Sequence, residues 1–117
     1  MYKHGHADAQ CQVAFMYDQG LGDVRNEQSS ASKVLLWYTH AANQHHSHAQ
    51  YNLGMIYEKR KQNIKAMEWY QRAANQNHAN AQYNLSAMHE RLVQQSEENN
   101  TKEQHLHNNT MAFYLNK

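Results

Sequence analysis

The feature that most constrains this chain is an internal repeat. The sequence Ala-Gln-Tyr-Asn-Leu occurs at residues 49–53 and again 32 residues later, at 81–85. A second block, which begins with Trp-Tyr and ends with Ala-Ala-Asn-Gln, fills residues 37–44 and recurs with the same offset at 69–76. A looser copy of the first block lies at 9–17. A period of about 20 to 50 residues is typical of solenoids, in which each unit packs against its neighbours.

Both blocks have the spacing of amphipathic helices. Apolar residues at 49, 53, 56 and 57, and at 66, 69, 70, 73 and 74, follow the 3.6-residue period of one helix face. The chain has no proline and four glycines, so few residues would interrupt a helix. We expect Asn63 to cap the second helix of this unit and Asn77 to end it in the left-handed conformation.

These helices predict an all-α fold, an α/α solenoid of antiparallel helix hairpins with about two and a half units. We expect one domain over residues 1–117, with units near 5–45, 46–77 and 78–117. The first unit has eight extra residues between its blocks, in a turn-rich segment that suits a loop between helices.

The third unit departs from the pattern. Residues 94–109 are too polar to build core, and we expect them to form a mobile loop or a frayed helix end. Residues 111–117 resemble 67–73 but arrive 12 residues late, so the second helix of this unit is expected to begin after that polar insertion.

Packing is expected to depend on small and aromatic residues at fixed repeat positions. Ala14, Gly54 and Ser86 are equivalent, and their small side chains would let two helices approach closely. Trp37 and Trp69, with the tyrosines beside them, are expected to fill the space between helices and to be the main contributors to the core.

The pattern Ala-x-Ala-Gln-x-x-Leu-Gly-x-x-Tyr, followed by Ala-x-x-Trp-Tyr-x-x-Ala-Ala, resembles the SEL-like repeat, a branch of the tetratricopeptide-repeat superfamily. Residues 49–57 and 66–74 carry the resemblance, and 7–17 and 33–42 carry it more loosely. The resemblance implies an α-solenoid that acts as a protein–protein adaptor. It also implies that the protein is bacterial. His45 and Asn77 stand where the family usually has glycine, and His89 replaces a tyrosine.

The predicted partner-binding surface is the concave side of the solenoid. If the apolar stripe of each first helix faces its partner helix, the opposite stripe lines that side. Aromatic residues and methionine flanked by charges suit recognition of a protein segment, although Tyr51 and Tyr83 equally fit as packing between neighbouring helices. The predicted residues are Phe15, Asp18, His48, Tyr51, Met55, Glu58, Lys59, Tyr83, Ala87, Glu90 and Arg91, with Asp8, Cys11, Gln19 and Asn80 at equivalent positions.

Composition argues against several other classes of partner. The chain has 11 basic and 10 acidic residues, whereas nucleic acids and anionic membranes select clustered positive charge. The longest apolar run, residues 34–38, is far shorter than a membrane-spanning helix. The N-terminus lacks the apolar stretch of a signal peptide, so we expect the chain as given in the cytoplasm, or in the periplasm if a leader was removed.

No arrangement of residues predicts catalysis or a cofactor. Ser30 and Lys33 match the Ser-x-x-Lys motif of penicillin-recognising enzymes, but the partner motifs Ser-Asp-Asn and Lys-Thr-Gly are missing from the sequence. We expect Ser29 or Ser30 to cap a helix instead. A lone cysteine, Cys11, excludes an internal disulfide and a multi-cysteine zinc module, and is expected to be inert.

The ten histidines raise the question of a metal site. His45, His46 and His48 cluster near a turn between units, but a structural site needs about four preorganised ligands, so we predict no native metal. His6, His46 and His78 share one repeat position and are interpreted as residues of the unit boundary.

The sequence therefore predicts a non-enzymatic protein-interaction module. Two alternatives stay open. One is an immunity or inhibitor protein that neutralises a bacterial toxin or effector. The other is self-assembly, because the ends of a short solenoid expose apolar surface unless they are capped.

Overall fold

The structure is a computed structural model that describes the backbone of residues 3–20 and 27–115 and the side chains of residues 6–20, 31–109 and 111. These residues form α1 (Lys3–Asp18), α2 (Glu27–Ala42), α3 (Ser47–Lys59), α4 (Asn63–Ala74) and α5 (Ala79–Leu115), with no strand among them. The chain divides into two compact units, Met1–Leu85 and Ser86–Lys117. The predicted all-α fold of helix hairpins is confirmed.

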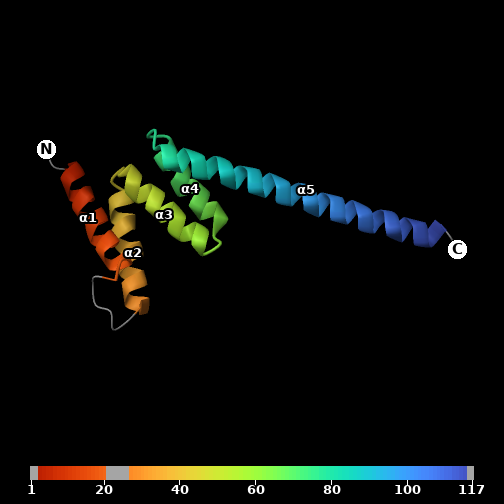
Figure 1. The fold of residues 1–117 in the computed structure, drawn as a ribbon, viewed down its shortest axis with the longest axis horizontal. Coiled ribbons are helices and arrows are strands. Elements are labelled where there is room, and N and C mark those ends of the chain that lie inside the picture. The colour runs from red at the N-terminus through yellow and green to blue at the C-terminus, as the bar shows by residue number, and fades with distance from the viewer. Residues whose placement is uncertain (1–2, 21–26, 116–117) are drawn as a thin grey trace. The chain divides into compact units, whose positions relative to one another are not determined.

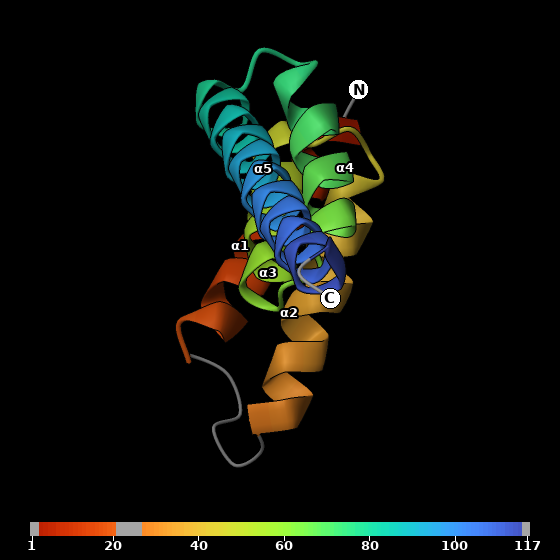
Figure 2. The same ribbon diagram turned by 90° about the vertical axis from the view of Figure 1, so that its right-hand side faces the viewer.

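The first compact unit contains two antiparallel hairpins. In Figures 1 and 2, α1 runs beside α2 and α3 beside α4, and α2 also packs against α3. Each hairpin places a first block and a second block of the sequence repeat side by side. The sequence repeat is thus a repeat of helix pairs, as predicted.

The core lies where the first hairpin meets α3. It is a cluster of small and medium side chains whose apolar members recur at repeat positions. Tyr38 and Tyr70 are buried, whereas Trp37 and Trp69 are only partly buried. The expectation that the Trp-Tyr pairs are the main core residues is therefore correct for the tyrosines and wrong for the tryptophans, which pack against the core from its edge. The cluster consists of Ala7, Cys11, Ala14, Val34, Tyr38, Ala41, Ala42, Ala49 and Leu53.

The close approach predicted at Gly54 is present. A β-carbon built on Gly54 would lie 2.6 Å from two carbons of the Tyr70 ring, closer than nonbonded carbon atoms can approach. Ala14, at the equivalent position of the first unit, is also buried, but Ser86 is exposed. The small residue is thus required where an aromatic ring of the second helix packs on it.

Several helix boundaries differ from those expected. Gln62, with no side-chain cap bond, precedes α4, so Asn63 is its first helical residue and not its cap. α2 begins at Glu27, which places Ser29 and Ser30 inside the helix. Asn77 adopts the predicted left-handed conformation with φ of 65°, and His45 does the same at the equivalent position.

α5 differs most from the prediction. Residues 94–109, expected to be a loop or a frayed end, lie within one continuous helix of 37 residues, and residues 111–115 continue it. The expected second helix of the third unit is therefore wrong for the described part of the chain. Residues 79–115 contain neither glycine nor proline, so no residue there breaks the helix.

The loop of the first hairpin begins at Gly20, whose φ of 76° is left-handed. Most of the eight-residue insertion falls on residues 21–26, which lie outside the described part of the chain.

Candidate functional site

A groove of about 520 Å³ lies along α1 and the beginning of α3. We call it the α1–α3 groove. One stripe of α1 forms one wall, since its residues are spaced by three or four positions and share a helix face. The lining residues are Asp8, Cys11, Gln12 and Phe15 from α1, and His46, His48 and Asn52 from the start of α3.

His46 fixes one end of this groove. Its Nδ1 accepts a hydrogen bond from the Ala49 backbone N–H at 3.0 Å, so it caps α3. Because Nδ1 is an acceptor there, the neutral ring carries its proton on Nε2, which lies 2.6 Å from Asp8 Oδ1 and donates to it. The contact ties α1 to the start of α3 and confirms that His46 is a boundary residue.

Phe15 is the apolar feature of the groove. About half of its side chain, 51%, is exposed, which is unusual for a phenylalanine on a helix that packs against a core. Cys11 lies one turn earlier and is buried; burial, reinforced by the charge of Asp8, raises the pKa of its thiol. The thiol therefore stays protonated, as expected of an inert cysteine.

A stack of aromatic rings adjoins the groove. The Tyr51 ring lies 4.8 Å from the ring of His78 and 6.1 Å from the ring of His48, measured between centroids. His78 caps α5 through Nδ1, which accepts from the Ala81 N–H at 3.2 Å. Burial lowers the pKa of both histidines, and for His48 the neighbouring His78 and His46 lower it further. Both rings are therefore predominantly neutral at pH 7.

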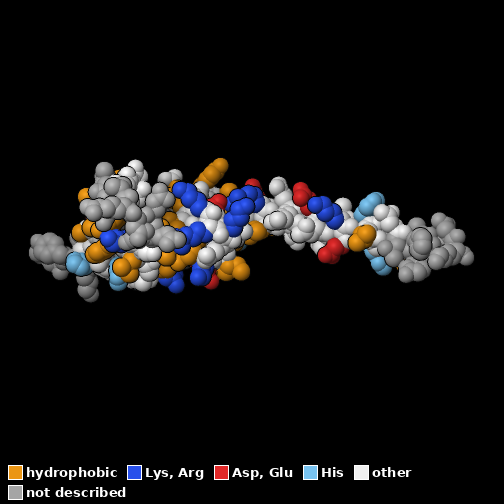
Figure 3. Space-filling view, turned by 90° about the horizontal axis from the view of Figure 1, so that it is seen from below, with side chains coloured by type: hydrophobic (Ala, Val, Ile, Leu, Met, Phe, Trp, Pro, Cys, Tyr) orange, Lys and Arg blue, Asp and Glu red, His pale blue; other side chains and the backbone are white. Residues whose placement is uncertain are grey.

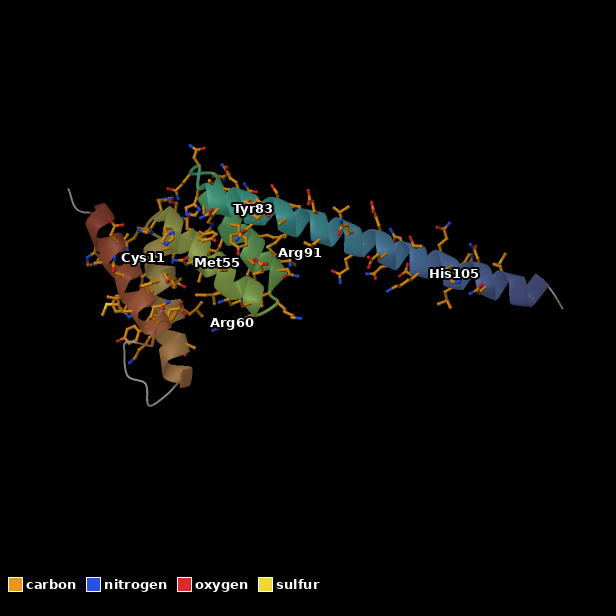
Figure 4. All side chains as sticks on the ribbon, viewed as in Figure 1. Cys11, Met55, Arg60, Tyr83, Arg91 and His105 are labelled. Carbon is orange, nitrogen blue, oxygen red and sulfur yellow. The ribbon has the colours of Figure 1, made fainter. Side chains whose placement is uncertain are left out.

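Tyr51 is half-buried in this stack, whereas Tyr83 is 74% exposed. The two tyrosines therefore differ: Tyr51 packs between neighbouring units, as one interpretation of the sequence had it, and Tyr83 does not share that environment. Figure 4 shows Tyr83 near the start of α5 and Met55 on α3.

Glu58, predicted to set specificity, has a structural partner. The buried Tyr70 hydroxyl donates to Glu58 Oε1 at 2.7 Å and accepts from Asn84 Nδ2 at 3.3 Å. Burial and then the bond to Glu58 raise the pKa of Tyr70. Burial likewise raises the pKa of Tyr38 to about 12, and Asn52 contributes a hydrogen bond there, so the Tyr–Asn contact repeats between units.

The structure brings together only part of the predicted surface. Phe15 and His48 line the α1–α3 groove, Tyr51 adjoins it, and Met55 is half-buried on the same helix as Tyr51. The charged residues predicted around it are exposed, apart from the half-buried Glu58. Ala87, half-buried, belongs with Glu90 and Arg91 to the second compact unit. The exposed charged residues of the predicted surface are Asp18, Lys59, Glu90 and Arg91.

Sequence reasoning missed three groove residues: Gln12, His46 and Asn52. Gln12, Asn52 and Asn84 share one repeat position, so a carboxamide recurs at the same place in all three units. That recurrence was the available signal. His46 was noticed as a boundary residue, but its bond to Asp8 depends on the packing of α3 against the first hairpin.

The surface differs between the two compact units. Figure 3 shows hydrophobic side chains gathered over the α1–α4 region, while the later part of α5 presents mainly charged, histidine and other polar groups. Within the described ranges, no three His, Cys, Asp or Glu side chains lie close enough to hold a metal ion. None of the helices in that part of the chain is long and apolar enough to cross a membrane.

Comparison with known proteins identifies the family of the repeat. The sequence profile of the Sel1 repeat matches residues 7–46, 47–78 and 79–101. A crystal structure of a Sel1 repeat protein from Oxalobacter formigenes is 37% identical to this chain, with a TM-score of 0.61. That match covers 70% of this chain and 34% of the other, so this chain spans about a third of its length.

The search of curated proteins gave no significant match. Sel1 repeats are generally protein–protein interaction modules and are typically not catalytic. Three matched repeats covering most of the sequence, together with the hairpins seen in the structure, establish the relationship. The chain belongs to the Sel1 repeat family.

Proposed function

We propose that this protein is a non-enzymatic interaction module that binds a partner polypeptide in the α1–α3 groove. The observation that carries the proposal is the exposed Phe15 ring in a groove whose other lining residues, apart from the buried Cys11, are polar. An exposed aromatic ring supplies a large apolar contact at small entropic cost, and such residues are frequent anchors of protein interfaces. The proposed binding site therefore uses only those residues of the predicted concave surface that belong to the first compact unit.

The polar groups of the groove favour an extended segment of the partner. Gln12 is exposed, and its carboxamide offers both donors and an acceptor; the half-buried Asn52 bonds to Tyr38 and offers its remaining groups. An extended peptide has free backbone N–H and C=O groups that match such side chains. Asp8, whose side chain is 67% exposed, adds an acceptor that favours a donor or a basic side chain beside the apolar anchor.

Site-specific photocrosslinking tests this proposal. A benzoylphenylalanine in place of Phe15 is expected to yield a discrete adduct in extracts of the source cell, and mass spectrometry would identify the partner. The same probe at Ile64 is the matched control, because Ile64 is also an exposed apolar residue but lies on α4, outside the groove.

Binding of the identified partner is then measured with purified proteins. Phe15→Ala is expected to weaken it by about tenfold or more, whereas Ile64→Ala leaves it unchanged. Circular dichroism confirms that both variants keep their helicity. Equal affinities of wild type and Phe15→Ala would show that the groove is not the binding site.

The identity of the partner decides between an adaptor and an inhibitor. A tight one-to-one complex with a secreted toxin or effector that loses its activity on binding supports an immunity protein. Several partners bound weakly through the same groove support an adaptor. We favour the adaptor because it needs no feature beyond the groove itself.

A further inference from the structure

The two junctions between successive units carry the same histidine cap. His46 and His78 share one repeat position and stand immediately before α3 and α5. Nδ1 of each ring accepts a hydrogen bond from the backbone N–H three residues later, at 3.0 Å in α3 and 3.2 Å in α5. Each histidine therefore caps its helix as a neutral ring, and a proton on Nδ1 removes the acceptor.

The side chain of the preceding unit that faces this cap differs between the junctions. Asp8 of α1 and His48 of α3 are equivalent in the repeat. At the first junction, His46 Nε2 lies 2.6 Å from Asp8 Oδ1. At the second, the ring of His78 faces the ring of His48, with 5.8 Å between their centroids and 31° between their planes. A carboxylate in the first unit is thus replaced by an imidazole in the second.

Acid therefore acts differently at the two junctions. Protonation of His46 turns its contact with Asp8 into an ion pair, which holds α1 to the start of α3 even when the cap is lost. Protonation of His48 and His78 puts like charges on two neighbouring rings. The charge on His78 also lies at the N-terminus of α5, where the helix dipole disfavours a cation. Both effects weaken the second junction.

The remaining groups around the histidine pair do not supply a counter-charge. Within the described ranges, neither His48 nor His78 has a carboxylate partner of its own. On α1, Asp8 and Cys11 line the groove with His48, but Asp8 bonds at the first junction, and burial raises the pKa of the Cys11 thiol and keeps it uncharged. On α3, the Tyr51 ring stacks on His78 at 4.8 Å, and the attraction of a cation for a tyrosine ring at most offsets the lost cap.

Both rings of the pair bind a proton more readily when they are released than when they are packed. Burial lowers the pKa of His48 and of His78, and the neighbouring His78 and His46 lower that of His48 further. Such groups stabilise the packed state above their unfolded pKa, and this stability is lost as the pH falls through the lowered values.

We propose that the junction between α3 and α5 is an acid-sensitive joint, at which the first turns of α5 detach from α3 between about pH 7 and 5 while the junction between α1 and α3 stays closed. Residues 79–85 belong with α3 to the first compact unit, so the joint lies inside that unit. Its determinant is the histidine at position 48 where the first unit has Asp8. Detachment uncovers the face of Tyr51 on which His78 stacks. The inference does not depend on the proposed function.

Amide hydrogen exchange of the full chain, resolved by residue with NMR between about pH 7.5 and 5, tests the proposal. Residues 49–53 and 81–85 both read Ala-Gln-Tyr-Asn-Leu, so their intrinsic exchange rates match closely and one stretch is the internal control for the other. We expect the protection of residues 82–85 to fall by about tenfold or more relative to residues 50–53, because a lost cap and two like charges act together.

Exchange of the two facing residues tests the determinant. His48→Asp gives the second junction the carboxylate of the first, and residues 82–85 are expected to stay protected at the acid end of the range. Asp8→His gives the first junction the histidine pair, and residues 50–53 are then expected to lose protection as well. His89→Asp is the matched control and should behave as the wild type, because His89 is an exposed histidine of α5 in the other compact unit.

Four results would overturn the proposal. The first is a wild-type protection ratio that does not change with pH. The second is an equal loss in both stretches, which is acid unfolding of the whole unit. The third is a His48→Asp variant that opens as the wild type does, and the fourth is a His89→Asp variant that prevents opening as fully as His48→Asp. Circular dichroism at neutral pH confirms that each variant is folded, and the wild-type ratio remains decisive even if Asp8→His unfolds.

Discussion

Substitution of Gly54 by alanine separates helix propensity from packing. Gly54 lies inside α3, where alanine stabilises a helix by about 1 kcal/mol relative to glycine. Sequence rules alone therefore predict a more stable protein. The structure predicts the opposite, because the new methyl group would lie 2.6 Å from two carbons of the Tyr70 ring.

The cost follows from how firmly Tyr70 is held. Overpacking a core by one methyl group typically costs about 1 to 3 kcal/mol, depending on whether the neighbour can move. Tyr70 is fully buried, and its hydroxyl bonds to Glu58 and Asn84 restrict any shift of the ring. We therefore expect a cost of about 3 kcal/mol for the overlap plus about 1 kcal/mol for a weakened hydrogen bond. After the gain of about 1 kcal/mol in helix propensity, the net loss is about 3 kcal/mol.

Urea unfolding followed by circular dichroism measures this loss. Ser86→Ala is the control, because Ser86 holds the same repeat position but is exposed, and alanine there should be neutral or stabilise by about 0.5 kcal/mol. The melting temperature of Gly54→Ala is expected to fall by roughly 8 to 16 °C. If Gly54→Ala were as stable as the wild type, Tyr70 would not pack on this position and the account of the hairpin would be wrong.

Three other perturbations test the contacts between units. Gln50→Ala removes a buried donor and acceptor and is expected to cost about 1 to 3 kcal/mol in urea unfolding, whereas Gln82→Ala, at the exposed equivalent, should cost well under half as much. Tyr70→Phe removes the hydroxyl that bonds to Glu58 and should cost about 1 to 2 kcal/mol; an unchanged midpoint would contradict that bond. Burial lowers the pKa of His48 and His78 below 6.5, so the unfolded chain binds protons more readily than the folded one. The stability that these groups contribute is then fully present above about pH 6.5 and falls as the pH drops through the lowered pKa values. The variant His78→Asn keeps a cap that does not titrate, so it should flatten the profile of unfolding free energy measured from pH 8 to 5.

The sequence repeat predicts much of the fold. The four helices of the two hairpins follow from blocks whose apolar spacing is unambiguous, and the left-handed conformation of Asn77 follows from its place at a helix end. These features are local or repeat with a constant period. They can be predicted because they depend only on the spacing of residues along the sequence.

The errors have physical causes of another kind. The sequence analysis predicted a loop or frayed end at residues 94–109 because these residues are polar. Glutamine, glutamate and lysine are nevertheless good helix formers, and neither glycine nor proline interrupts α5. Glu58 was predicted to face a partner, whereas it accepts a hydrogen bond from the buried Tyr70 hydroxyl, and that pairing depends on where α4 meets α3. The α1–α3 groove was found only in part for the same reason: its His46–Asp8 contact joins residues 38 positions apart.

Glutamine side chains recur at the junctions between successive hairpins. Gln50 and Gln82 donate to the carbonyls of Ala42 and Ala74, which end the preceding hairpin, and Gln44 and Gln76 bond to the glutamine of their own unit. A helix end that is buried against the next unit leaves carbonyls that must be paired. A charged side chain could pair them only by losing its own hydration, whereas a carboxamide carries both a donor and an acceptor without charge. The same residue type therefore serves both junctions, the buried one at Gln50 and the exposed one at Gln82.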